Sequence, residues 1–123
     1  MSYYKNAALE IIRLGLWNHR VQSTLAMEID LPVYHLECLL LIHLEHPERA
    51  SILSNKLGIH KSSLSKLLSA LQERGLIERR LGATDRRTEK VALTRAGIAL
   101  VKKVLLSAEK VTRSLLVLLR PER

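Results

Sequence analysis

The stretch HKSSLSKLLSALQERGL, residues 60–76, decides the fold, because it predicts one amphipathic helix that ends at a glycine. Its apolar residues recur at the three- and four-residue spacing of a buried helix face: Leu64, Leu67, Leu68 and Leu71. The other face carries small hydroxyl and basic side chains: Lys61, Ser62, Ser65, Lys66 and Ser69. The preceding segment ASILSNKLGI predicts a shorter helix that ends at Gly58. Two helices joined by a turn at residues 58–60 match the helix-turn-helix pattern.

After Gly75 the helical period gives way to the alternation that is typical of strands. In LIERRLG, residues 76–82, the side chains of Ile77 and Arg79 fall on one face and those of Glu78 and Arg80 on the other. KVALT, residues 90–94, predicts a second strand antiparallel to the first. The connection between them places three charged residues at the tip of a hairpin, where they cannot help to bury a core: Asp85, Arg86 and Arg87.

Long helices flank this central region on both sides. Residues 3–27 place apolar side chains at helical spacing, and Pro32 separates that helix from a second one at residues 33–46. Thr94 can cap a last helix at residues 95–119, which would be about 38 Å long at 1.5 Å per residue. Such a helix extends beyond its own small domain, so its apolar face needs a partner, and a second copy of the chain is the simplest one. The expected dimer contacts are Leu9, Ile12, Leu16, Val101, Leu105, Ala108, Leu115 and Leu119.

Composition limits the class of protein. The 123 residues fit a single domain at residues 1–123, whose core must come from Leu, Ile, Val and Ala, because the chain has no Phe and one Trp. The single Cys excludes an internal disulfide framework, and the N-terminus lacks the pattern of a signal peptide. The apolar runs are far shorter than the roughly 20 residues that span a bilayer. We therefore expect a cytoplasmic protein without a membrane segment, and no residue pattern indicates an enzyme.

Positive charge is concentrated in the central region. The chain has a formal net charge of +8, and residues 49–95 supply +7 of it, with eleven Lys or Arg against four acids. A surplus confined to one segment is the pattern expected of a face that binds a polyanion, although a merely solvated surface is the plainer alternative.

The residues of the hairpin also carry a family resemblance. DRRTEKVALTRAG, residues 85–97, resembles the wing signature of the MarR family of bacterial transcription regulators, in which Asp-x-Arg is followed by an apolar residue, Leu-Thr and Gly. The matching positions are Asp85, Arg87, Val91, Leu93, Thr94 and Gly97. LPVYHLECLLLI, residues 31–42, is similar to the family's second helix, and residues 61–80 are similar to its recognition helix and first wing strand. The resemblance covers nearly the whole chain.

The sequence departs from the family at two points. His60 stands where the family usually has Ser or Thr to cap the recognition helix, so Ser62 or Ser63 would have to supply that contact. The chain also ends at Arg123, earlier than many members, from which we expect a simpler dimer.

The resemblance implies a winged helix-turn-helix, mostly α with a small two-stranded β wing. A DNA-binding lobe is expected at residues 33–94, with dimerisation helices at residues 3–27 and 95–119. By the same resemblance, Arg87 enters the minor groove and Asp85 holds it in place, since a narrow minor groove attracts Arg. The expected DNA contacts are Lys61, Ser62, Ser63, Ser65, Lys66, Ser69, Arg79, Arg86 and Arg87.

Regulation by a ligand stays open at this point. A metal site built from His35, Cys38, His43 and His46 competes with buried or interfacial histidines, because no zinc-like pair spacing closes within one chain. Cys38 as a thiol sensor competes with a buried, unreactive Cys. Relatives that bind small aromatic acids suggest an effector pocket here, for which the candidate residues, equally explained as core and surface, are Arg13, Trp17 and Tyr34.

The sequence therefore predicts a homodimeric, sequence-specific regulator of transcription, a repressor by default, that binds a pseudo-palindromic double-stranded operator. It would act on the nucleoid of a bacterium or archaeon, without a metal or other cofactor. Two alternatives remain: a winged-helix module that binds an acidic protein, and a DNA-binding protein of architectural type that ignores sequence.

Overall fold

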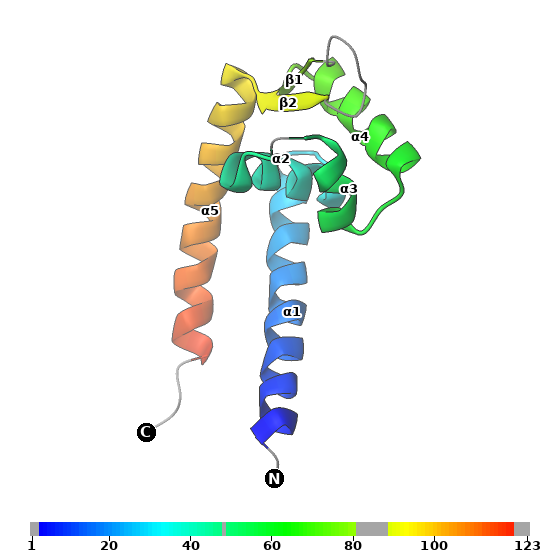
Figure 1. Cartoon of the computed structure of the whole chain (residues 1–123). Coiled ribbons are helices and arrows are strands. Elements are labelled where there is room, and N and C mark those ends of the chain that lie inside the picture. Colours follow the sequence, from blue (N-terminus) through cyan, green and yellow to red (C-terminus); the bar gives the residue numbers. More distant parts are fainter. Residues whose placement is uncertain (1–2, 48, 81–88, 120–123) are drawn as a thin grey trace.

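The helices and strands follow one another in the predicted order (Figure 1). The computed structural model describes residues 3–47, 49–80 and 89–119, with side chains up to residue 114. Within these residues the elements are α1 (Tyr3–Glu28), α2 (Val33–Glu45), α3 (Ser51–Leu57), α4 (Lys61–Glu73), β1 (Ile77–Arg80), β2 (Lys90–Leu93) and α5 (Arg95–Leu119). The predicted fold class, mostly α with a two-stranded antiparallel sheet, is confirmed.

The helix ends lie where local backbone chemistry places them. Pro32, in extended geometry, directly precedes α2. α3 and α4 end in the same way, at Gly58 with φ 68° and at Gly75 with φ 72°. In each case the amide after the glycine donates to a carbonyl five residues earlier, from Ile59 to Ser54 and from Leu76 to Leu71, both at 3.0 Å. These left-handed glycines turn the chain sharply, so that α4 is held between α3 and the sheet.

The two strands pair antiparallel, with Ile77 opposite Leu93 and Arg80 opposite Lys90. A further backbone bond, from the amide of Ala50 to the carbonyl of Glu89 at 2.8 Å, joins the start of α3 to this sheet. The sheet is therefore fixed to the helix-turn-helix along one edge.

Thr94 locks the sheet to α4 and α5. Its hydroxyl donates to the carbonyl of Gly75 at 2.5 Å and accepts from the amide of Gly97 at 3.1 Å, so the predicted cap of α5 is confirmed. The amide of Thr94 also donates to the carbonyl of Leu76 at 3.0 Å. A Cβ at Gly97 would lie 2.1 Å from that same carbonyl oxygen. Only glycine allows α5 to begin so close to the turn that ends α4.

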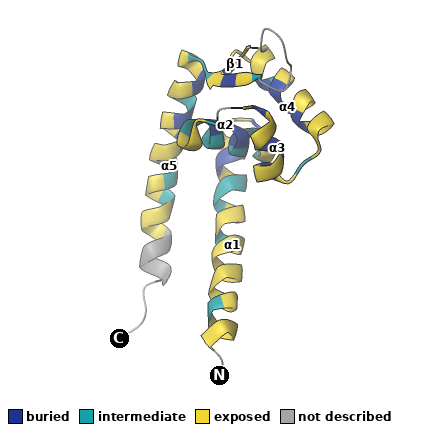
Figure 2. Cartoon of the chain, in the orientation of Figure 1, coloured by how far each residue is buried: buried dark blue, intermediate teal, exposed yellow. Residues whose placement is uncertain are grey.

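The main core lies between α2, α3, α4, the sheet and the start of α5. Leu39, Leu53 and Leu71 are fully buried there. A second cluster joins α1, α2 and α5 through Leu25, Leu36 and other buried residues. Figure 2 shows the buried positions gathered in this central lobe, whereas the first turns of α1 are mostly exposed.

α1 and α5 extend away from the central lobe side by side, so that the start of α1 and the end of α5 lie on the same side of the molecule (Figure 1). α1 joins the lobe through its last turns, where Leu25 and Ala26 are buried. In the residues that the structure describes, no helix combines the length and the apolar character that a membrane crossing needs.

Candidate nucleic-acid interface

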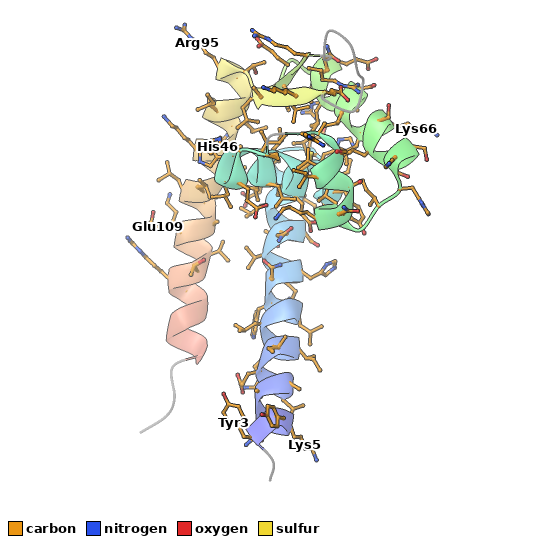
Figure 3. All side chains as sticks on the ribbon, in the orientation of Figure 1. Tyr3, Lys5, His46, Lys66, Arg95 and Glu109 are labelled. Atoms are coloured by element: carbon orange, nitrogen blue, oxygen red, sulfur yellow. The ribbon has the colours of Figure 1, made fainter. Side chains whose placement is uncertain are left out.

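α4 presents the polar face that the sequence predicts. Leu64, Leu67, Leu68 and Leu71 are buried against the lobe, and Figure 3 shows Lys66 on the outer side of the helix. The predicted contact residues of α4 are all exposed: Lys61, Ser62, Ser63, Ser65, Lys66 and Ser69. This face is cationic and rich in hydroxyl groups, so it can donate hydrogen bonds to phosphate oxygens and base edges.

The beginning of α4 carries no side-chain cap. His60 stands at the N-cap in extended geometry and makes no capping hydrogen bond. No hydrogen bond from Ser62 or Ser63 replaces it within the described part of the chain. The positive end of the helix dipole is therefore not offset by a side-chain oxygen, and it lies beside Lys61.

Arg79 is placed differently from the other predicted contacts. Its Nε lies 2.5 Å from Oε1 of Glu89, and its Nη1 donates to Oγ of Ser69 at 3.1 Å. The side chains of Arg79 and Glu89 are only 19% and 16% exposed. Ser69, Arg79 and Glu89, here called the Arg79 brace, connect α4 to β1 and to the residue that directly precedes β2. Arg79 is thus held within the protein instead of projecting toward solvent.

Sequence reasoning missed the role of Glu89. The strand alternation placed Arg79 on the same face as Ile77, which is the buried face, and that was the signal against a free cation. A charge on a buried face needs an opposite charge nearby. Glu89, just before β2, is the acid that can reach it.

The three charged residues of the wing tip, Asp85, Arg86 and Arg87, lie outside the described residues. The strand ends that flank them are described, and Arg80 pairs with Lys90 in the last rung of the ladder. Their predicted roles therefore remain predictions.

The predicted dimer face is largely exposed in the single chain. On α1 the exposed fractions of Leu9, Ile12 and Leu16 are 49%, 60% and 65%, and on α5 that of Leu105 is 39%. Large apolar side chains so exposed on a long helix indicate a surface that a partner covers. Ala108 is partly buried against the second core cluster.

Other parts of that prediction need correction. Val101 is fully buried within its own chain, because it packs in the main core, so it is not available to a partner. The side chains of Leu115 and Leu119 are outside the described part of α5.

Burial determines the chemistry of the residues that were considered for sensing, Cys38 and His35. Cys38 is fully buried, and burial raises the pKa of its thiol to about 12, so the thiolate needed for redox chemistry does not form at neutral pH. Burial, and to a lesser extent the Arg74 guanidinium, lowers the pKa of His35 below its usual value. No three His, Cys, Asp or Glu side chains within the described residues are grouped so as to hold a metal ion.

The three effector candidates do not share one surface. Tyr34 lines a hollow of about 410 Å³ beside α4, together with His35, Ser63 and Lys66. Trp17 instead lies under the guanidinium of Arg20, whose Cζ is 5.4 Å from the ring centroid. Arg13 pairs with Glu10 along α1 at 3.4 Å.

Comparisons with known proteins agree with this geometry. The model of the MarR family matches residues 35–88, from α2 to the segment between the strands. Among solved structures, the transcriptional regulator Tm0710 from Thermotoga maritima is 24% identical, with a TM-score of 0.71 over 94% of this chain and 82% of that one. Staphylococcus aureus MarR, in complex with salicylate and kanamycin, is 22% identical, with a TM-score of 0.75 over 98% and 78%. The S. aureus MepR–DNA complex is 18% identical, with a TM-score of 0.66 over 92% and 85%. At these identities the structures show a common fold.

Proposed function

We propose that this chain, a member of the MarR family, is a non-enzymatic transcription regulator that binds double-stranded DNA as a homodimer. The observation that carries the proposal is the exposed face of α4, on which every predicted contact residue is free of the core. That face belongs to the second helix of a helix-turn-helix, the helix that enters the major groove in such proteins. The structural likeness to S. aureus MepR in a complex with DNA supports the same use of the fold.

Within this proposal the residues divide into contacts and supports. Lys61 and Lys66 would bind phosphate oxygens, and the serines of α4 would reach phosphates and base edges. Arg86 and Arg87 would approach the flanking minor groove, with Asp85 holding Arg87 in place. The Arg79 brace would keep α4 and the wing at a fixed angle, so that both grooves are engaged together.

A homodimer follows from the exposed apolar faces of α1 and α5. Leu9, Ile12 and Leu16 lie on one long helix, and pairing two copies would remove them from water. Two lobes related by a twofold axis would read half-sites about one helical turn apart, which predicts a pseudo-palindromic operator. Occluding a promoter in this way is repression, the default mode of action.

A small-molecule effector is part of the proposal. S. aureus MarR is known in complex with salicylate. Tyr34 lines a hollow of about 410 Å³ beside α4, and we assign such a response to that hollow and not to Arg13 or Trp17. The protein would act in the cytoplasm of a bacterium or archaeon, on the nucleoid.

DNA binding is tested by titrating Arg87→Ala and Lys66→Ala against a selected operator and against random duplex at about 0.15 M salt. We expect wild type to prefer its operator by 10³-fold or more. Arg87→Ala should weaken operator binding by about 1–3 kcal/mol while the protein remains folded. Wild type that binds both duplexes equally would favour an architectural protein, and wild type that binds neither would favour a module for an acidic protein.

The dimer is tested by sedimentation of Ile12→Glu combined with Leu16→Glu. Both side chains are more than half exposed in the single chain, so the changes should yield folded monomers. A matched control is Glu10→Gln, which alters a polar position on the same helix. A variant that remains dimeric would exclude α1 from the interface.

A further inference from the structure

The outer face of the wing sheet carries a cationic groove that the proposed contacts do not use. It has a volume of about 630 Å³ and lies between the end of α2 and the two strands. Its charged lining residues are Arg49, Glu78, Arg80 and Lys90. All four are exposed, and together they give this outer groove a net charge of +2.

The arginines on the two faces of the sheet differ in their ion pairing. Arg79 lies on the inner face and is neutralised by Glu89. Successive side chains of a strand point to opposite faces, so Arg80 lies on the outer face, directly opposite Lys90 in the register. Within residues 3–47, 49–80 and 89–114, neither of them nor Arg49 forms an ion pair.

Like charges directly opposite each other on a sheet destabilise it. The sheet places Arg80 opposite Lys90, and the α2–α3 connection adds Arg49. Because none of the three forms an ion pair with another described residue, a repulsion remains that an anion from outside can relieve. The groove is open and its cations are exposed, which suits phosphate groups on a surface better than a small enclosed ligand.

We propose that the outer groove binds backbone phosphates of the duplex just outside the half-site, an inference that rests on the proposed function. One observation favours DNA over an acidic protein. Arg80 and Lys90 are the strand ends that flank residues 81–88, which carry Arg86 and Arg87, so the groove continues the proposed wing contact along the chain. The brace places α4 on the inner side of the sheet, so the sheet separates α4 from the groove.

A duplex that takes α4 in its major groove and the wing in the next minor groove continues past the sheet toward the outer groove. The wing would then be held to DNA from both sides. Arg80 and Lys90 would contact phosphates that carry no sequence information, and Glu78 would disfavour approach to the far end of the groove.

The test compares wild type with Arg80→Gln combined with Lys90→Gln on two duplexes. One duplex ends at the outer edges of the two half-sites, and the other extends about one helical turn further on each side. Each phosphate contact contributes about 0.9 to the slope of log K against log salt, and the two protomers of the dimer together place four of these cations on the long duplex. We therefore expect the double variant to lose roughly 3.6 of slope on the long duplex. On the short duplex the variant and wild type should have the same slope. The matched control removes two exposed lysines of α1 and α5, Lys5→Gln with Lys110→Gln, and should leave both slopes unchanged. Figure 3 shows Lys5 at the end of α1 that is far from the lobe.

Thermal unfolding shows whether the substitutions act through stability and not through lost phosphate contacts. Removing two facing cations should keep or raise the melting temperature, and Arg49→Gln alone provides a milder variant that should lose about half of the slope change. A double variant that retains the steeper slope on the long duplex would overturn the groove as a phosphate site, and in that case an acidic protein becomes the better partner. Wild type that shows no preference for operator over random duplex would instead refute the proposed function, whichever slopes are found.

Discussion

Removing the charge of Glu89 tests the Arg79 brace, because simple electrostatics predicts a gain in DNA affinity whereas the brace predicts a loss of stability and of sequence discrimination. Glu89→Gln keeps the shape of the side chain and removes its charge. If Glu89 were only an acid near DNA, its removal would strengthen binding to any duplex. At about 10 Å from a phosphate in water, that effect is about 0.4 kcal/mol, or roughly twofold in affinity.

The brace predicts a loss of stability instead. The Nε of Arg79 lies 2.5 Å from Glu89, and the two side chains are 19% and 16% exposed, so the pair is mostly shielded from solvent. A hydrogen bond to a charged group in such a setting contributes about 1.5–3 kcal/mol, between the values for exposed and fully buried pairs. For a chain of this size the melting temperature should fall by about 6–12 °C.

The same change should reduce discrimination between DNA sequences. Without Glu89, Arg79 no longer holds Ser69 and the wing in one arrangement, so α4 and the wing engage their grooves less often together. A loss of about 1.4 kcal/mol in this coupling would lower the preference for operator over random duplex about tenfold. Affinity for random duplex should stay the same or rise slightly.

The assays are thermal unfolding by circular dichroism and titration of operator and random duplex, with all variants at one protein concentration. Glu73→Gln is the control, because it removes an equal charge from an exposed acid of α4 that has no ion pair among the described residues. If Glu89→Gln strengthened binding to operator and to random duplex equally, and left the melting temperature unchanged, the brace would be refuted.

Three further outcomes follow from the packing and burial of single residues. Gly97→Ala should lower the free energy of unfolding by about 1–3 kcal/mol or more, because its Cβ would lie 2.1 Å from the carbonyl oxygen of Leu76. Gly15→Ala, which has open space around it, should raise the free energy of unfolding by about 0.5–1 kcal/mol. Urea denaturation of both variants tests the two predictions. Cys38, with a pKa of about 12, should resist thiol reagents at pH 8 in the native protein and react on unfolding, and rapid native labelling would contradict its burial. The pKa of His35 is lowered in the folded chain, so as pH drops below about 6.5 the unfolded state binds the proton more readily and stability should fall. Wild type should therefore lose more stability than His35→Gln between about pH 7.5 and 5.5. Parallel curves of stability against pH for the two proteins would show that His35 does not titrate as described.

The order and ends of the helices could be predicted because their causes are local. Pro32 cannot continue a helix, and Gly58 and Gly75 adopt left-handed geometry at little cost, so the chain marks its own boundaries. The polar face of α4 was equally readable, since four leucines fix which side is buried.

Contacts between distant residues could not be predicted in the same way. Val101 has the spacing of a dimer contact, but periodicity does not distinguish burial within one chain from burial between two. Arg79 was counted with the free cations because a charge map records charges and not their partners, and its bond to Ser69 spans ten positions. The outer groove depends on the register that places Arg80 opposite Lys90, and a shift of one residue would move these side chains to the other face.

The most direct test is selection of binding sites from randomised duplex DNA at about 0.15 M salt, where loose attraction beyond about 8 Å is screened. A sequence-specific dimer should recover an inverted repeat with half-sites about one helical turn apart. Retention of DNA without any common sequence, or no retention at all, would contradict the proposal that this chain reads an operator.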